Sequence, residues 1–356
     1  MNKARINNFC GQDSMKLVEV MKKIDANASG ILFIINEKDR LVGAISDGDI
    51  RRWLIKTADL DADIKIFMNK SPKYLYAADK LNALSFMKKK KIRAVPIVDE
   101  QRRILDIILD DDENIGFVKK DALLDVPVII MAGGKGTRLY PYTKILPKPL
   151  IPIGDIPILE RIINRFCEFG ASEYYMTVNY KKNMIKAHFA ELEPEYSIEY
   201  VEENKPLGTG GSIKLIQKKF ECPVIVTNCD TLINADYEDI YRYHIESGNK
   251  MTMVSALKNI EVPYGVVHSA ENGVIIGLEE KPKLSYFINT GMYIVDEDML
   301  EKIPEDTFFH MTDLANLLMQ QDLQVGMYPI SEDSFLDMGE FEEMKRMEEK
   351  IFEREK

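Results

Sequence analysis

Apolar and polar positions follow one repeated pattern in the first third of the chain. Two stretches, Ile31–Asp49 and Ala94–Asp112, each hold an apolar run, a charged turn, a second apolar run and an acidic end. Apolar runs on either side of a polar turn predict a buried β-hairpin in each copy. Before each hairpin, apolar residues recur at helical spacing: first Met15, Leu17, Val18, Met21 and Ile24, then Leu81, Leu84, Phe86 and Met87. The pattern predicts a helix–strand–strand unit that occurs twice.

A second region follows a charged stretch at residues 119–125. Its first apolar run, Val126–Met131, passes directly into the glycine-rich segment Ala132–Leu139, and a later apolar run, Pro223–Asp230, ends in a carboxylate. Glycines or Asp after an apolar strand predict an α/β sheet with a ligand site at its C-terminal edge. We therefore expect a small repeat module over residues 1–120 and a larger α/β domain over residues 126–356.

Composition and charge narrow the possible functions. The chain has 356 residues, of which 46% are hydrophobic, and 47 basic against 58 acidic residues give a net charge of −11, which disfavours nucleic-acid binding. No run approaches the roughly 18 apolar residues of a membrane span, and the first residues lack a signal-peptide pattern. Four cysteines without a Cys-x-x-Cys pair predict neither a disulfide framework nor a zinc site. We expect a cytoplasmic protein that binds neither nucleic acid nor membranes.

The glycine-rich segment predicts a phosphate-binding loop. Glycines such as Gly133 and Gly134 let backbone N–H groups approach phosphate oxygens where a side chain would clash. The segment lacks the Gly-Lys-Ser/Thr ending of a Walker loop. Further along, two prolines fix the backbone on either side of Lys148. Together with Arg138, this lysine would place two cations around a polyphosphate.

An ordered set of motifs runs through the second region. Gly-Gly-x-Gly-Thr-Arg-Leu and Pro-Lys-Pro are followed by Pro206–Gly211, Tyr264–Val267, Glu280–Pro282, Asn289–Gly291 and Phe335–Gly339. This order resembles the signature of the sugar-1-phosphate nucleotidyltransferases over roughly residues 126–356. The resemblance implies a Rossmann-like domain with a mixed central sheet. It also implies that a sugar 1-phosphate oxygen attacks the α-phosphorus of a nucleoside triphosphate, which yields a nucleotide sugar and pyrophosphate.

The resemblance also implies roles for individual charged residues. Asp230 and Asp337 are the expected ligands of Mg²⁺, since two carboxylates, phosphate oxygens and water satisfy its octahedral, all-oxygen preference. Lys148 is expected near the α-phosphate, Arg138 beside the departing pyrophosphate, and Lys281 on the phosphate of the sugar. The alternative for each Asp is a loop or cap residue, and for each cation a solvated surface charge.

Further positions are expected to contact the two substrates. The nucleotide is expected on Ala132, Gly133, Gly134 and Gly208, and the sugar hydroxyls on the backbone of Gly265, the carboxylate of Glu280 and the side chain of Asn289. Turn chemistry is the alternative for Gly265 and Asn289. Two positions depart from the family's pattern, Cys229 where Gly is common and Glu340 where a small residue is usual. Cys229 is expected to narrow the space near the ribose and to bear on nucleotide preference.

Glu203 is the candidate residue for reading the base. Family members that read uracil or thymine tend to place an amide side chain five positions before the glycine that is Gly208 here. An ionised carboxylate only accepts hydrogen bonds, and guanine offers two adjacent donors, whereas uracil and thymine offer one N–H between two carbonyls. We therefore predict the use of GTP. Glu202 stays open as a rival for this role, at an offset of one residue.

The repeat in residues 1–120 resembles a tandem pair of CBS domains. In that family a Ser or Thr followed three positions later by Asp binds the ribose of a nucleotide, and Ser46 and Asp49 fit this pattern. The second copy has Leu109 in place of the serine and keeps only Asp112, so we expect at most one good site. The structural alternative is that Ser46 and Asp49 cap the helix that follows them.

A CBS pair joined to this transferase, without a C-terminal β-helix, resembles the guanylyltransferases that make a GDP-linked glucosamine or N-acetylglucosamine precursor for legionaminic acid. Three alternatives stay open: mannose-1-phosphate as the sugar, CTP or UTP as the nucleotide, and a non-catalytic protein that senses an adenine or guanine nucleotide. Because CBS pairs commonly stack with one another, a homodimer or larger homo-oligomer is expected.

Overall fold

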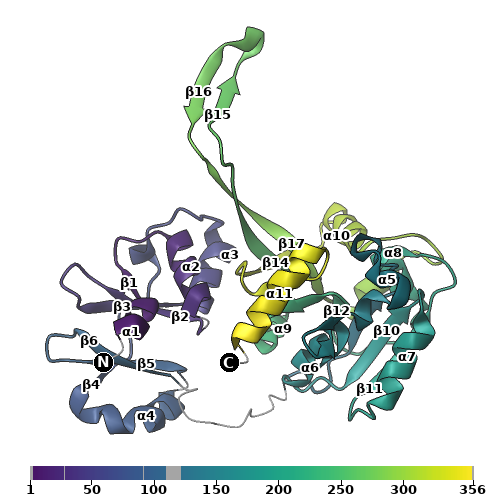
Figure 1. Ribbon diagram of the computed structural model, residues 1–356, viewed down its shortest axis with the longest axis horizontal. Coiled ribbons are helices and arrows are strands. Elements are labelled where there is room, and N and C mark those ends of the chain that lie inside the picture. The colour runs from purple at the N-terminus through teal and green to yellow at the C-terminus, as the bar shows by residue number, and fades with distance from the viewer. Residues whose placement is uncertain (1–2, 28, 91, 110–121, 355–356) are drawn as a thin grey trace. The chain divides into compact units, whose positions relative to one another are not determined.

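The computed structural model describes residues 3–27, 29–90, 92–109 and 122–354 (Figure 1). The chain divides into two compact units, Met1–Val118 and Lys119–Lys356, and each is considered by itself. None of the helices within the described ranges has both the length and the apolar character that a membrane span requires.

The N-terminal unit holds two three-stranded sheets of the same topology. In each, a short first strand runs parallel to the second strand, and the second and third strands form an antiparallel hairpin. Both hairpins predicted from the sequence are confirmed. The elements are α1 (Lys3–Phe9), β1 (Cys10–Gln12), α2 (Leu17–Asn27), β2 (Ile31–Ile35), β3 (Leu41–Ser46), α3 (Asp47–Thr57), η1 (Ile64–Ile66), β4 (Leu75–Tyr76), η2 (Ala77–Asn82), α4 (Ala83–Lys90), β5 (Ala94–Val98) and β6 (Ile104–Leu109).

The helix that precedes each hairpin packs its apolar face inward. In α2 the buried residues are Leu17, Val20, Met21 and Ile24, which recur every three or four positions as one helix face requires. The predicted second helix is shorter, because the 3₁₀ turn η2 occupies its first residues and α4 begins only at Ala83.

The C-terminal unit is built on a seven-stranded sheet in the order β11-β10-β7-β12-β17-β14-β18. The first four strands are parallel, β17 is antiparallel to both of its neighbours, and β18 is parallel to β14. This confirms the predicted α/β fold with a mixed central sheet. The strands are β7 (Val128–Ala132), β8 (Pro152–Ile153), β9 (Ile156–Pro157), β10 (Glu173–Val178), β11 (Ser197–Glu202), β12 (Val224–Asn228), β13 (Thr231–Ile233), β14 (Met251–Glu261), β15 (Val266–Ser269), β16 (Ile275–Glu279), β17 (Lys283–Val295), β18 (Val325–Ile330) and β19 (Phe335–Asp337).

Helices cover both faces of this sheet. Alternate residues of β7 point to opposite faces, so that Ile130 joins an apolar core with α6 and α9, while Ile129 joins another core with α10. The helical segments are η4 (Thr137–Leu139), α5 (Tyr142–Ile145), η5 (Lys148–Leu150), α6 (Ile158–Cys167), α7 (Lys182–Glu191), α8 (Gly208–Gly211), η6 (Ser212–Leu215), α9 (Tyr237–Ser247), η7 (Glu271–Gly273), η8 (Glu297–Lys302), α10 (Met311–Gln320) and α11 (Phe341–Arg354).

Two features of the C-terminal unit depart from a flat layered sheet. Strand β12 ends at Asn228, two residues before Asp230, and the chain then enters the short strand β13, which pairs with β19. Strands β14 and β17 run on beyond the sheet, and the hairpin β15–β16 continues from them as a projecting arm, drawn in green in Figure 1. The turn after β12 borders the cavity described below, whereas the arm places its residues at a distance from that cavity.

Candidate active site

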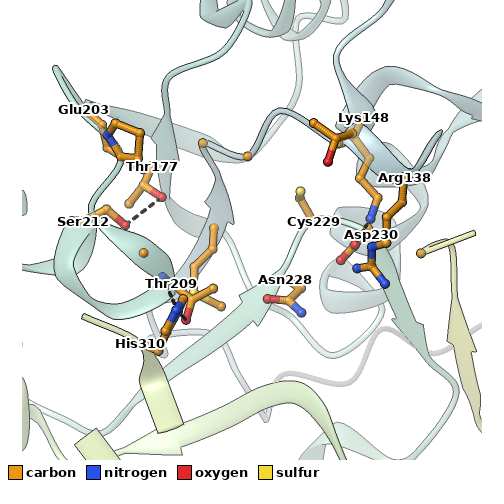
Figure 2. A pocket seen from close by; sticks show the side chains of 18 of the residues that line it. Arg138, Lys148, Thr177, Glu203, Thr209, Ser212, Asn228, Cys229, Asp230 and His310 are labelled. Carbon is orange, nitrogen blue, oxygen red and sulfur yellow. Dashed lines mark hydrogen bonds and ion pairs between the residues drawn. The ribbon is translucent and has the colours of Figure 1, made fainter. Parts of the chain in front are cut away.

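A cavity of about 460 Å³ lies at the C-terminal ends of β7 and β12. Figure 2 shows two groups of side chains across it, with Arg138, Lys148 and Asp230 on one side and Glu203 and other polar side chains on the opposite side. Seven residues expected to bind a substrate or metal line it: Gly133, Gly134, Arg138, Lys148, Glu203, Gly208 and Asp230. Ala132 is buried at the end of β7, directly before this glycine-rich loop.

The glycine-rich loop fits closely around Lys148. Gly136 has φ +63°, and a Cβ built on it would lie 2.9 Å from Cγ2 of Thr143 and 3.0 Å from Cβ of Lys148. A residue with a side chain would therefore be strained there and would collide with its neighbours. Lys148 starts the 3₁₀ turn η5 between its two prolines and is only 9% exposed. The loop and the prolines together hold the lysine against the cavity.

Lys148 and Asp230 form a partly buried ion pair between Nζ and Oδ2. Asp337 lies next to this pair, because β13 and β19 set Thr231 opposite Asp337 and the N–H of Met338 donates to the carbonyl oxygen of Asp230 at 2.9 Å. Burial raises the pKa of Asp337, and the negative charge of Asp230 raises it further. The structure therefore brings together the two carboxylates that the sequence separates by more than a hundred residues.

The two carboxylates fit a hard divalent cation. The negative charge of Asp230 destabilises the ionised form of Asp337, and a cation between the two carboxylates would remove that repulsion. No cluster of three or more His, Cys, Asp or Glu side chains suited to a metal occurs in the part of the chain that the structure describes. Mg²⁺ held by Asp230 and Asp337 would therefore take its other oxygen ligands from phosphate groups and water.

Glu203 is held at the other side of the cavity. It is 7% exposed, and a Cβ built on Gly133 would lie 2.3 Å from its Oε1, so the carboxylate lies directly on the glycine-rich loop. Burial raises the pKa of Glu203, although hydrogen bonds from the N–H of Leu207 and from the side chains of Ser212 and Asn179 work in the opposite direction. The cavity therefore holds a buried hydrogen-bond acceptor.

Glu202 lies outside the cavity. Its exposed carboxylate pairs with Lys182 and with Lys186, both on α7, and these hydrogen bonds lower its pKa to about 2. Glu202 is exposed at the end of β11, whereas Glu203, the next residue, is buried. Of the two candidates, Glu203 is the one that lines the cavity.

The residues expected around the sugar are not brought to the cavity. Gly265, Glu280 and Lys281 lie exposed on the arm, where a Cβ built on Gly265 would be 3.0 Å from Oε2 of Glu280. Asn289 lies at the base of the arm, where its Nδ2 donates to the hydroxyl of Tyr293 at 2.6 Å and its Oδ1 accepts from the N–H of Gly291 at 3.0 Å. The cavity thus gathers most of the residues expected to bind the nucleotide and its phosphates, whereas the residues expected to bind the sugar are not among the described residues that line it.

Several lining residues carried no signal in the sequence. Phe308 and His310 belong to the loop before α10 and stand in no recognised motif, yet both line the cavity. His310 Nδ1 lies 3.3 Å from Oγ1 of Thr209, which belongs to the Leu-Gly-Thr motif. Cys229, by contrast, was singled out from the sequence; it lines the cavity, and burial raises the pKa of its thiol to about 12. It therefore remains a neutral thiol beside Asp230.

In the N-terminal unit, Ser46 and Asp49 form a capping box at the start of α3. The N–H of Asp49 donates to Oγ of Ser46 at 3.3 Å, and the N–H of Ser46 donates to Oδ2 of Asp49 at 2.9 Å. Arg52 also donates to Oδ1 of Asp49 at 2.7 Å. In this structure both side chains therefore cap helix α3, as the structural alternative expects. Leu109 ends β6, and Asp112 lies outside the described residues.

Each unit contains a segment that matches a known protein family. Residues 127–354 match the family model of nucleotidyl transferases, and residues 12–56 match that of CBS domains. The mannose-1-phosphate guanyltransferases of Debaryomyces hansenii and Saccharomyces cerevisiae are each 33% identical over 184 residues, which is 49% of this chain and 51% of theirs. The chain therefore spans about half the length of these curated relatives.

A solved structure agrees with the family match. HddC from Yersinia pseudotuberculosis superposes with a TM-score of 0.50 and 25% identity, and the alignment covers 64% of this chain and 99% of that one. Because the family model spans more than half of the residues and includes the whole cavity, the chain belongs to the nucleotidyl transferase family.

Proposed function

We propose that this chain is a Mg²⁺-dependent guanylyltransferase that joins GTP to a sugar 1-phosphate, glucosamine- or N-acetylglucosamine-1-phosphate in particular. The observation that carries the proposal is the buried carboxylate of Glu203, which shares one cavity with Arg138, Lys148 and Asp230. It offers guanine two acceptor oxygens at the end of the cavity opposite the cations.

The proposed reaction needs no covalent enzyme intermediate. An oxygen of the sugar phosphate forms a bond to the α-phosphorus of GTP while the bond from that phosphorus to the bridging oxygen breaks, so pyrophosphate leaves with the electron pair. Arg138 and Lys148 neutralise negative charge on the phosphate oxygens, and the glycine-rich loop donates backbone N–H groups to them. Asp230 and Asp337 would hold Mg²⁺, which supplies further charge neutralisation when it is bound.

Lys148 has a second part in this proposal. Its ion pair with Asp230 keeps both charges satisfied before the substrates arrive. When the triphosphate binds, its oxygens would replace Asp230 as the ion-pair partner of Lys148. The carboxylate of Asp230 could then hold the cation. Lys148 would thereby couple nucleotide binding to metal binding.

Mannose-1-phosphate is the second candidate for the sugar. The relatives from Debaryomyces hansenii and Saccharomyces cerevisiae bear the name mannose-1-phosphate guanyltransferase. The joining of a CBS module to the transferase supports the amino sugars, and with them a role in making a GDP-linked precursor for legionaminic acid. The candidates would use the same base and the same reaction. They differ in the substituent at one ring position, which is an amino or acetamido group in the glucosamines and a hydroxyl in mannose.

The deciding experiment is pyrophosphate release by the purified protein with Mg²⁺. GTP, CTP, UTP, ATP and dTTP are each crossed with glucosamine-, N-acetylglucosamine- and mannose-1-phosphate. Release with GTP and one amino sugar is the expected result, and release with GTP and mannose-1-phosphate would select the second candidate. Release with a pyrimidine triphosphate alone would overturn the role of Glu203. No release with any pair would leave a nucleotide-binding protein without turnover as the better description.

We also propose that residues 1–120 form a regulatory pair of CBS domains in which Ser46 and Asp49 hold the ribose of an adenine or guanine nucleotide. The CBS match over residues 12–56 includes both residues. Melting of the full chain is compared with and without AMP, ADP, ATP and GTP, in the wild type and in Asp49→Ala. Loss of the cap lowers stability by about 1 kcal/mol with or without nucleotide. A nucleotide-dependent shift of the wild type that Asp49→Ala retains would show that this pocket is structural.

A further inference from the structure

The arm of the C-terminal unit leaves the sheet at the edge where the cavity lies. Strand β17 is antiparallel to β12 with Tyr293 opposite Val226, so Gly291 is level with Asn228 at the end of β12, and Asn289 lies two residues beyond that end. From Asn289 back to Lys283 the strand continues for six more residues, which is about 20 Å at roughly 3.3 Å per residue. Glu280 and Lys281 lie beyond that point, and among the described residues that line the cavity none comes from residues 262–282.

One face of the arm is apolar and exposed. Val267 and Leu278 are direct cross-strand partners in the hairpin, and Ile276, two residues from Leu278, is the unpaired residue of a β-bulge. Leu278 is 74% exposed, Ile276 68% and Val267 53%. A two-stranded hairpin is at best marginally stable in water, and a contiguous exposed apolar patch marks an interaction surface. The arm therefore presents a face suited to a protein partner.

The charges on the arm and beside the cavity are complementary. The arm carries two adjacent exposed carboxylates, Glu279 and Glu280, and the glycine-rich loop beside the cavity presents exposed Lys135 and Arg138. Opposite charges on two surfaces steer and orient their association. Each chain carries both of these complementary surfaces. In a symmetric pair, the arm of each chain can therefore contact the glycine-rich loop of the other.

We propose that the partner of the arm is a second copy of this chain, and that each arm places Glu280 and Lys281 at the mouth of the other chain's cavity. The proposal rests on the proposed function, in which these two residues bind the sugar 1-phosphate. Each active site would then combine the nucleotide and phosphate residues of one chain with the sugar residues of another. A two-fold pair would complete two sites and cover both apolar arm faces at once.

The test combines two variants that are defective in different parts of the site. Asp230→Asn disables the cavity and leaves the arm intact, whereas Lys281→Ala disables the arm and leaves the cavity intact. The two full-length chains are co-expressed with different affinity tags, and tandem purification isolates the mixed pairs. The assay uses a sugar 1-phosphate concentration well below the wild-type KM, where loss of Lys281 lowers the rate about 10-fold. In the exchanged arrangement one of the two sites in each mixed pair is complete, so we expect about half of the wild-type activity per pair.

Two results would overturn the proposal. A wild type that sediments as a single chain has no partner to receive the arm. A mixed pair no more active than the purified Lys281→Ala protein would mean that each arm serves its own chain. A mixed pair of Asp230→Asn with Lys148→Ala, both in the cavity, is the matched control and should stay inactive. Absence of activity in the wild type would contradict the proposed function, a result visible before any mixing.

A second measurement does not depend on activity. A photoreactive benzoyl-phenylalanine replaces Leu278 in the full chain, and the irradiated protein is run on a denaturing gel. We expect a band of two linked chains, with peptides joined from the arm to the glycine-rich loop. The same probe in place of Ile245, an exposed residue of α9, is the control and should give a single-chain band. Links from Leu278 within its own chain alone would exclude the exchange.

Discussion

The cavity and the arm carry motifs of the same family in opposite physical settings. Around the cavity, Lys148 and Glu203 are less than a tenth exposed and are fixed by prolines, glycines and strand pairing. On the arm, Glu280 and Lys281 lie exposed in the bend between β16 and β17. The comparison suggests that one half of the site is preorganised by the sheet, whereas the other half acquires its position only through a further contact.

Asp230→Asn should have the largest effect, because it removes a charge from the preorganised half. The variant leaves Lys148 without its partner carboxylate and removes one of two expected metal ligands. We expect kcat to fall by about 10³-fold, which corresponds to the several kcal/mol that metal-assisted charge neutralisation supplies. Steady-state pyrophosphate release measures it. Asp155→Asn, which changes a largely exposed carboxylate paired with Arg161 at 3.2 Å, is the control and should retain activity.

Glu203→Gln should alter the choice of base. The amide presents one acceptor and one donor group where the carboxylate presents two acceptors, so guanine loses a hydrogen bond and meets a repulsive contact. We expect the preference in kcat/KM for GTP over UTP to fall by about 100-fold, near the upper end for one bidentate base contact. Competition between the two triphosphates measures the ratio. Glu202→Gln changes the neighbouring exposed carboxylate and should leave the ratio unchanged; an equal loss in both variants would refute the assignment.

Lys281→Ala should have a smaller effect, confined to the sugar substrate. Loss of one charged hydrogen bond to the phosphate should raise KM for the sugar 1-phosphate about 10-fold and leave KM for GTP unchanged. Lys283→Ala, in which the lysine lies 3.4 Å from Glu261 on the same arm, is the matched control. If Lys281→Ala instead raised KM for GTP, the division of the site between cavity and arm would be wrong.

The sequence predicted the parts of the fold that depend on local pattern. The two hairpins follow from apolar runs around a polar turn, and both occur at the expected residues. Strand β12 ends two residues before Asp230, because the chain turns there to pair β13 with β19. That pairing joins segments a hundred residues apart, and no local signal in the sequence encodes it.

The site divides in the same way. Motifs located Lys148, Asp230 and Glu203, and the structure gathers all three in one cavity. The positions of Phe308 and His310 depend on how the loop before α10 packs, which no motif marks. Glu280 and Lys281 lie away from the cavity because of the length and direction of β14 and β17. The pattern of apolar and polar residues in these two stretches does not reveal that direction.

The pH dependence of GTP binding should give the smallest effect and the finest test of the buried half. Burial raises the pKa of Glu203, so as the pH falls the carboxyl takes up a proton sooner than an ordinary glutamate and loses one acceptor oxygen. KM for GTP should therefore rise as the pH is lowered from about 8 toward the ordinary glutamate pKa of about 4.3, and the rise should begin at a higher pH than an ordinary glutamate would give. The exposed Glu202, whose pKa its two lysines lower to about 2, stays ionised throughout this range. Titration of GTP itself cancels when the profile is divided by that of Glu203→Gln, and a ratio that stays flat with pH would mean that Glu203 does not read the base in its ionised form.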